Sequence, residues 1–402
     1  MNQKESKTPE FTTPPGFLFG GAACGIKQNS ALDLSLVTSQ QPCVAAGVYT
    51  QNVVRAACID WNRRLTPSDS IRAVVTNSGN ANACTGDQGE TNCEQTAKLV
   101  AERLNCQADQ VVVLSTGVIG QQLPMSCLES GIADCELASD PDSFLRAADA
   151  ILTTDNGRKI ASANLKLDGY DGTILGMAKG AGMIGPNMAT MLSIIVTDFK
   201  MSAPNAQKLL TSSVEKSFNS ISVEGHTSTN DAVILLSSGI GPDVGENSAA
   251  SDKFADTLDS LCIKLAKQIP ADGEGATKLI DIRVSGATSD EQADQVARTI
   301  AASALVKTAI TGCDPNWGRI VSAAGYAGAT IELGHLTLAL NSHKVFENGS
   351  PVTFDEQVVS KTIADNKETL IELNIGTGQG TSTHWTSNLT SEYIRINSEY
   401  RT

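Results

Sequence analysis

The sequence has few of the residues from which metal sites, disulfide scaffolds and serine-hydrolase triads are built. Its four histidines lie far apart, and no H-E-x-x-H or G-x-S-x-G motif occurs. The ten cysteines are scattered, with no C-x-x-C pair. Because zinc sites and disulfide frameworks show closely spaced or paired ligands, we expect reduced cysteines, buried as small apolar side chains. No metal ion is predicted, and only Cys84, in a loop rich in Gly and Asn, is a candidate reactive thiol.

Positive charge and long apolar runs are also scarce. With 30 Lys and Arg against 44 Asp and Glu, the formal net charge is −14, which disfavours nucleic acid and anionic membranes as partners. No uninterrupted apolar segment approaches the roughly 20 residues that a membrane helix needs. The polar start of the chain, residues 1–6, is unlike a secretory signal. We therefore expect a soluble, cytoplasmic protein.

Aromatic residues make up only 4% of the chain, so the core has to be built from Ala, Val, Ile and Leu. A length of 402 residues exceeds one usual domain, and two or more packed units are expected. Strand patterns fall at 31–37, 43–49, 71–75, 111–114, 163–167, 173–178, 278–284, 329–340, 369–375 and 393–396. Helical patterns lie between them, at 93–104, 144–152, 203–218, 254–268 and 291–306. This alternation predicts α/β layers rather than a helix bundle or a β-sandwich.

One stretch, residues 179–192, reads K-G-A-G-M-I-G-P-N-M-A-T-M-L and leads into the β-branched segment 193–197. Threonine is a poor nucleophile unless a base lies beside it. Cutting the chain before Thr190 would free an α-amine, whose reference pKa of about 7.7–8.0 leaves it partly neutral near pH 7. The same composition is also typical of an ordinary Gly/Pro loop before a buried strand.

The stretch also contains a formal G-x-G-x-x-G, which could hold the phosphates of a dinucleotide. That fingerprint has to open a helix and be followed by an acidic residue about 20 positions later. Here Pro186 and a β-branched run follow instead, and Asp198 comes too early. An oxidoreductase is therefore disfavoured.

Five further motifs occur in order: T-N-S-G-N-A-N-A-C-T-G at 76–86, S-T-G-V-I-G at 115–120, T-S-T-N-D at 227–231, D-P-N-W-G-R at 314–319 and N-S-E-Y at 397–400. With residues 179–192, they resemble the landmarks of the glutamate N-acetyltransferase (ornithine acetyltransferase) family, self-cleaving enzymes of arginine biosynthesis. The resemblance runs from about residue 16 to residue 402. It implies a layered α/β architecture with mixed sheets, of the ornithine acetyltransferase or self-processing aminopeptidase type.

The resemblance implies cleavage between Ala189 and Thr190, giving an alpha chain of residues 1–189 and a beta chain of residues 190–402 that assemble as a heterotetramer. Thr190 would be the nucleophile. Thr116 and Gly117 would stabilise the oxyanion, and the end of the 111–114 strand pattern is a suitable place for such donors. No metal or organic cofactor is implied.

The resemblance also implies a pocket for an amino acid, formed by Thr153, Lys179, Thr190, Glu274, Asn397 and Thr402. A lysine suits the α-carboxylate of such a substrate, and a glutamate suits the cationic amine of ornithine. For Thr402 to take part, the C-terminus has to fold back into the pocket.

The implied activity is transfer of acetyl from N-acetylornithine to glutamate through an acetyl ester on Thr190. Acetyl-CoA is a second possible donor, because the assigned residues are common to family members with and without that activity. Apart from Lys179, only the pair Arg158 and Lys159 offers basic groups near the motif, so we expect N-acetylornithine to dominate. The alternative is a self-processing amidohydrolase or aminopeptidase that passes the acyl group to water.

Overall fold

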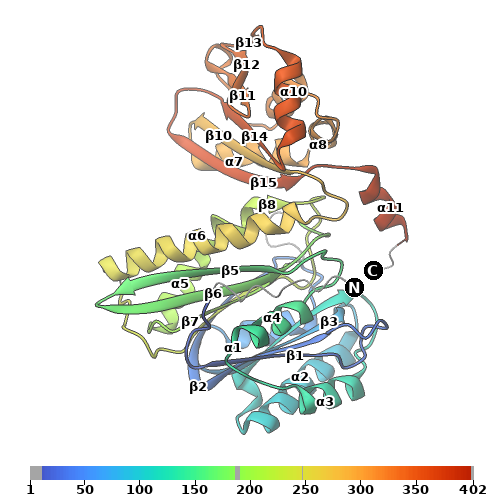
Figure 1. Ribbon diagram of the computed structural model, residues 1–402, viewed down its shortest axis with the longest axis vertical. Coiled ribbons are helices and arrows are strands. Elements are labelled where there is room, and N and C mark those ends of the chain that lie inside the picture. The colour runs from blue at the N-terminus through green and yellow to red at the C-terminus, as the bar shows by residue number, and fades with distance from the viewer. Residues whose placement is uncertain (1–10, 186–190, 247, 400–402) are drawn as a thin grey trace, which may run out of the picture.

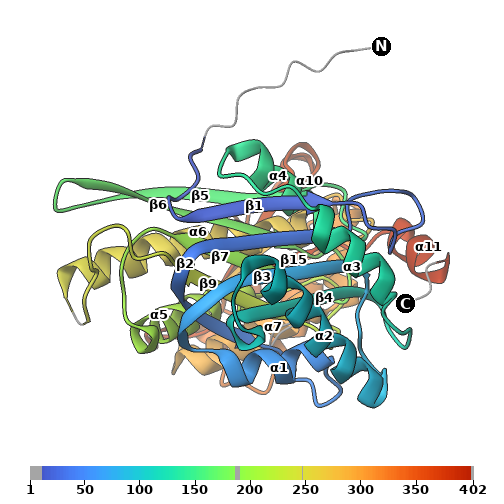
Figure 2. The ribbon, with the colours of Figure 1, turned by 90° about the horizontal axis from the view of Figure 1, so that it is seen from below.

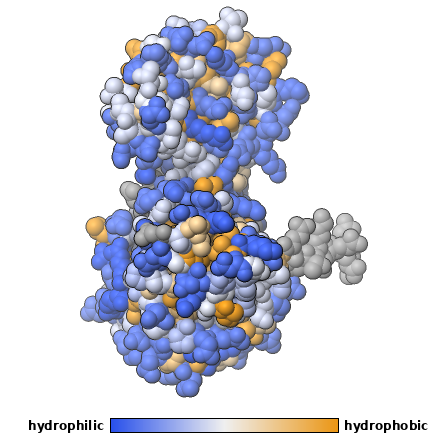
Figure 3. Space-filling model, turned by 90° about the vertical axis from the view of Figure 1, so that its left-hand side faces the viewer, coloured by the Kyte–Doolittle hydropathy of each residue, from blue (hydrophilic) through white to orange (hydrophobic). Residues whose placement is uncertain are grey.

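The computed structural model describes residues 11–185, 191–246 and 248–399, which form two α/β units stacked along the long axis of the molecule (Figure 1). Each unit is built around one mixed sheet. In the space-filling view, a narrower waist joins the two units, and hydrophilic side chains cover most of both (Figure 3).

The lower unit in Figure 1 contains an eight-stranded sheet with the order β4-β3-β2-β9-β7-β6-β5, in which β1 also pairs with β2. Its strands are β1 (Phe17–Ala22), β2 (Leu34–Tyr49), β3 (Ser68–Asn80), β4 (Val111–Val118), β5 (Lys159–Leu167), β6 (Tyr170–Lys179), β7 (Leu192–Thr197) and β9 (Ala232–Ser237). Its helices are α1 (Ala57–Leu65), α2 (Gly86–Leu104), α3 (Met125–Asp134), α4 (Pro141–Ala150), α5 (Ala203–Glu215) and α6 (Ala249–Ala271). The pairs β3–β4 and β7–β9 are parallel.

Both faces of this sheet are buried. On β7, Ile194 and Val196 belong to the core shared with α1, α2 and α4, whereas Ile195 belongs to the core shared with α5 and α6. Figure 2 shows α1, α2 and α3 grouped beside β3 and β4. Because a strand covered on both faces has no solvent side, residues 191–197 carry a continuous run of buried side chains instead of an alternating pattern.

The upper unit contains a seven-stranded sheet with the order β13-β12-β11-β14-β10-β15-β8. Its strands are β8 (Ile221–Ser222), β10 (Leu279–Ala287), β11 (Thr337–Leu340), β12 (His343–Glu347), β13 (Ser350–Pro351), β14 (Glu368–Asn374) and β15 (Gly380–Ser387). Its helices are α7 (Asp290–Ala302), α8 (Ala304–Thr311), α9 (Trp317–Gly325) and α10 (Glu356–Asp365). A last helix, α11 (Ser391–Glu399), leads from β15 back toward the lower unit (Figure 1).

Several sequence-based element predictions are wrong. Of the strand predicted at 329–340, only the last four residues form a strand, β11, and a 3₁₀ turn at Leu333–His335 precedes it. The strands predicted at 31–37 and 43–49 are one long strand, β2, whose pairing with β3 shifts between Thr38 and Cys43. The helix predicted over 291–306 is interrupted at Ser303, whose side chain caps α8. Residues 393–396 belong to helix α11 and not to a strand. That helix carries ion pairs from Arg395 to acidic residues three positions before and four positions after it, which stabilise a helix.

All ten cysteines lie in the described ranges, and none is in a disulfide. Five of them are buried as expected, and Cys84 is exposed. In the three described segments, no helix is both long and apolar enough to cross a membrane.

Candidate active site

One cavity, of about 80 Å³, collects most of the site residues that the sequence predicts. It is lined by Thr116, Gly117, Thr153, Lys179, Glu274 and Asn397, together with Ala81, Ile119, Thr154, Gly182, Met183, Ser228, Thr229 and Asn230. The other three predicted site residues, Ala189, Thr190 and Thr402, lie outside the described residues. Segments distant in the sequence therefore meet around one small cavity.

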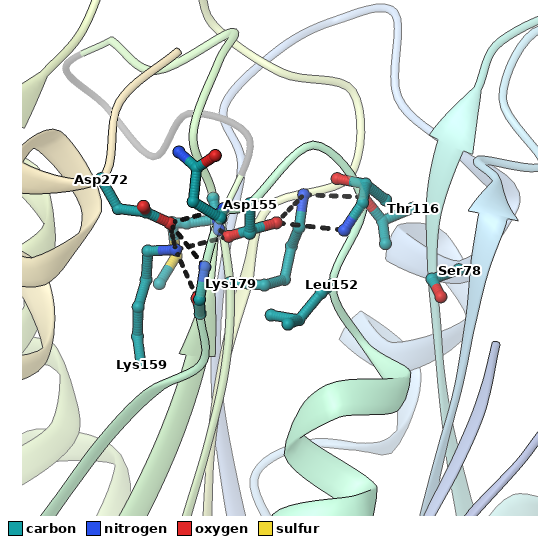
Figure 4. Close-up of polar contacts among 12 residues, drawn as sticks. Ser78, Thr116, Leu152, Asp155, Lys159, Lys179 and Asp272 are labelled. Atoms are coloured by element: carbon teal, nitrogen blue, oxygen red, sulfur yellow. Dashed lines mark hydrogen bonds and ion pairs between the residues drawn. The ribbon is translucent and has the colours of Figure 1, made fainter. Parts of the chain in front are cut away.

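Thr116 and Gly117 lie near the end of β4, where it pairs with β3. Gly117 has a φ of +133°, and a Cβ atom there would lie 2.3 Å from the carbonyl carbon of Gly79. Only glycine fits this close approach of two backbones. The Thr116 side chain is buried, and its hydroxyl oxygen accepts a hydrogen bond from Lys179 Nζ at 3.4 Å (Figure 4).

Lys179 is the last residue of β6 and pairs with Leu192 of β7, so it stands at the point where the 180–191 connection begins. Only 2% of its side chain is exposed. Burial lowers the pKa of Lys179, and the nearby Asp155 carboxylate, 3.9 Å from Nζ, acts against that shift. The cavity thus has a buried amine on one wall.

Glu274 follows the end of α6 and is nine-tenths buried. Its backbone N–H donates to the carbonyl of Ala181 at 2.8 Å, and its Oε2 accepts from Asn397 Nδ2 on α11 at 2.9 Å. A Cβ atom at Gly182 would lie 2.5 Å from the Glu274 carboxyl carbon, so this glycine lets the loop contact the carboxylate. A carboxylate therefore stands in the same cavity as the Lys179 amine.

Two residues of the T-S-T-N-D motif contribute contacts that the sequence did not assign. Asn230 Nδ2 donates to the carbonyls of Ala81 at 2.7 Å and Ser115 at 2.8 Å, which ties the ends of β3 and β4 to this motif. Asp231 is buried and accepts from the backbone N–H of Met191 at 2.7 Å. Burial raises the pKa of Asp231 well above its ordinary value. In the sequence, the feature that could have indicated these contacts is the cluster of small polar residues directly before the buried strand β9.

The cavity suits a small molecule that carries both charges. Lys179 can meet a carboxylate and Glu274 an ammonium group, while the threonine hydroxyls and Asn397 offer neutral hydrogen-bond partners. Over the described residues, no group of three or more His, Cys, Asp or Glu side chains is placed to hold a metal ion.

The fold and the cavity define a layered α/β enzyme with a small cavity, lined by charged and neutral polar groups, beside a glycine-rich connection. The chain belongs to the ArgJ family, whose model matches residues 18–402. The family resemblance of the sequence and the predicted α/β class are thereby confirmed.

Relatives match over almost the whole chain. The arginine biosynthesis bifunctional protein ArgJ of Rhodopirellula baltica is 45% identical over 400 residues, which cover 98% of both chains. The protein of the same name from Thermotoga neapolitana is 44% identical over 97% of this chain and 99% of its own. The crystal structure of the ArgJ protein of Bacillus halodurans has 38% identity and a TM-score of 0.51, and covers 52% of this chain and 100% of the solved chain.

Proposed function

We propose that this protein is an acetyltransferase of arginine biosynthesis, which moves the acetyl group of N-acetylornithine to glutamate. The observation that carries the proposal is the cavity in which Thr116, Lys179 and Glu274 meet. It occurs in a chain that is 45% identical to a protein named for arginine biosynthesis. Such substrates are free amino acids of the cytoplasm, where we propose that the enzyme acts.

The proposed reaction runs through an ester on Thr190. Its hydroxyl attacks the acetyl carbonyl while its freed α-amine accepts the hydroxyl proton, and ornithine leaves with a proton on its nitrogen. The Thr116 hydroxyl and the Gly117 N–H stabilise the negative oxygen of the tetrahedral intermediate. The amine of glutamate then attacks the ester, which restores Thr190 and yields N-acetylglutamate. No metal or organic cofactor takes part.

Both substrates present an α-carboxylate, which we assign to Lys179, with Thr153 beside it. Glu274 receives the side-chain amine of ornithine, and Asn397 holds Glu274 in place. Thr402 completes this pocket in the proposal.

The same hydroxyl makes the chain self-processing. Attack of Thr190 on the Ala189 carbonyl gives an ester, and its hydrolysis leaves an alpha chain of residues 1–189 and a beta chain of residues 190–402. The solved Bacillus halodurans chain matches about half of this chain along its whole length, which supports two pieces of similar size. We propose a heterotetramer of two alpha and two beta chains.

Because one nucleophile and one pocket serve both substrates in turn, we expect ping-pong kinetics. Rates measured at several fixed concentrations of glutamate, with N-acetylornithine varied, should give parallel double-reciprocal lines. Intersecting lines would show that both substrates bind before any acetyl group moves, which contradicts an acetyl-enzyme intermediate.

We expect N-acetylornithine to be a much better donor than acetyl-CoA. The net charge of −14 disfavours the approach of an anionic coenzyme, and of the basic groups near the motif, Lys159 and Arg158 already pair with aspartates. The test supplies glutamate with each donor separately and measures N-acetylglutamate. Comparable rates would overturn the prediction, and free acetate in place of N-acetylglutamate would indicate the amidohydrolase alternative.

A further inference from the structure

A buried carboxylate, Asp155, lies between two buried lysines beside the cavity (Figure 4). Its Oδ1 accepts hydrogen bonds from Lys159 Nζ and from the Gly180 N–H, both at 2.7 Å. Its Oδ2 accepts from the Thr153 N–H at 3.0 Å and lies 3.9 Å from Lys179 Nζ. One side chain therefore contacts both segments that carry Thr153 and Lys179.

The contacts continue from Lys159 to a second carboxylate. Lys159 Nζ lies 2.6 Å from Asp272 Oδ2, and the same oxygen accepts from the Asn156 N–H at 3.1 Å. Asp272 ends helix α6 and stands two residues before Glu274. The Asp155 network, defined as the side chains of Asp155, Lys159, Lys179 and Asp272, thus reaches a third segment of the cavity wall.

We propose that Asp155 is a positioning residue of this active site: its carboxylate holds the Lys179 side chain in place, and its link through Lys159 to Asp272 fixes the three substrate-binding segments relative to one another. This inference rests on the proposed function, in which Lys179 binds the α-carboxylate of the substrate.

The balance of charge in the Asp155 network explains why the carboxylate is needed. Burial lowers the pKa of Lys179, the Asp155 carboxylate raises it, and the Lys159 ammonium lowers it, while Asp231 and Glu274 raise it by smaller amounts. Burial alone would raise the pKa of Asp155, but Lys179 and Lys159 outweigh it and hold that pKa below its usual range. Asp155 is thus an anion at neutral pH, and the Lys179 amine depends on it to keep a proton.

The link to Asp272 gives Lys159 a carboxylate of its own. Without Asp272, the Lys159 ammonium could form an ion pair only with Asp155, and it would compete with Lys179 for that carboxylate. Two lysines and two aspartates balance in number, so a buried cluster can persist without an unpaired charge.

The first variant is Asp155→Asn, which keeps the size of the side chain and removes its charge. The pKa of Lys179 should fall, so the amine loses its proton at a lower pH than in the wild type. We expect KM for N-acetylornithine to rise about 100-fold at pH 8, which is the usual effect of removing one partner of a buried charged pair. The ratio of variant to wild-type KM should shrink as the pH is lowered, because Lys179 then regains its proton.

The second variant is Lys159→Met, which should act in the opposite direction. Without the neighbouring ammonium, Lys179 is the only lysine that pairs with Asp155, so the pKa of Lys179 rises. The increase of KM that accompanies deprotonation of Lys179 therefore moves to higher pH. A network that only stabilises the fold would make both variants worse in the same way at every pH. Opposite shifts of the KM profile support the positioning role, and shifts of the same sign, or none, overturn it.

Asp198→Asn is the matched control. Asp198 is also buried, accepts from the Tyr170 hydroxyl at 2.8 Å and the Thr173 N–H at 2.9 Å, and does not line the cavity. This variant should lower thermal stability and leave the KM profile unmoved. If Asp155→Asn fails to fold, Lys159→Met still decides the sign of the shift. Calorimetric binding of ornithine across the same pH range tests the Asp155 network even in a wild type that shows no acetyl transfer.

Discussion

Replacing Thr190 with alanine should leave the purified protein as one full-length chain without acetyltransferase activity. Both events should fail for one reason, because in the proposed mechanism the hydroxyl that attacks the Ala189 carbonyl of the precursor also takes the acetyl group in the mature enzyme. We expect kcat to fall by at least about 10⁴-fold, as for loss of other catalytic nucleophiles. Intact mass would show the uncut chain beside a wild type divided into residues 1–189 and 190–402.

The conservative variant Thr190→Ser is the control for this result. It keeps a hydroxyl and, once cut, a free α-amine, so it should be processed and retain part of the activity. A wild-type protein that is uncut and yet fully active would end the proposal of an N-terminal nucleophile.

Thr116→Val should lower kcat by about 10²–10³-fold with little change in KM. Valine has nearly the shape of threonine and lacks the hydroxyl that we assign to the oxyanion. The variant should therefore lose stabilisation of the transition state and bind the substrate almost as well as the wild type. Self-cleavage should slow as well, since it passes through a tetrahedral intermediate of the same kind. Steady-state kinetics and the time course of cleavage measure the two effects.

The matched control is the neighbouring hydroxyl of Ser115. It is also buried on β4, but it donates to Asn77 Oδ1 at 2.7 Å and does not line the cavity. Ser115→Ala should cost about 1 kcal/mol of stability, the usual effect of one lost hydrogen bond, and change kcat by no more than a few-fold. Equal losses of kcat in the two variants would mean that Thr116 acts only through the packing of β4.

The sequence predicted those parts of the molecule whose cause is local. The continuous apolar pattern at 111–114 predicted the strand that leads to Thr116, which the structure shows as β4. The five motifs and the 179–192 stretch predicted the family through resemblance, which the match over residues 18–402 confirms. The assigned roles of the site residues remain predictions.

What the sequence could not predict depends on contacts between distant residues. Lys159 and Asp272 are 113 positions apart, and nothing in the pattern around either one indicates the other. Residues 393–396 were predicted as a strand because a short segment with Tyr393 and Ile394 fits both periods. They lie in helix α11, which the exposed ion pairs of Arg395 stabilise modestly.

The cut between Ala189 and Thr190 would fall between neighbouring strands of one sheet. β6 pairs with β7, and β2 pairs with β9, so the two adjacent strands from after the cut lie between strands from before it on both sides. The two pieces would therefore stay joined until the sheet itself unfolds. Folding of the precursor is a first-order event, but recovery of the cut protein after denaturation requires two chains to meet and depends on their concentration. Such a protein can be unfolded reversibly before processing, whereas dilution after processing makes unfolding a permanent loss.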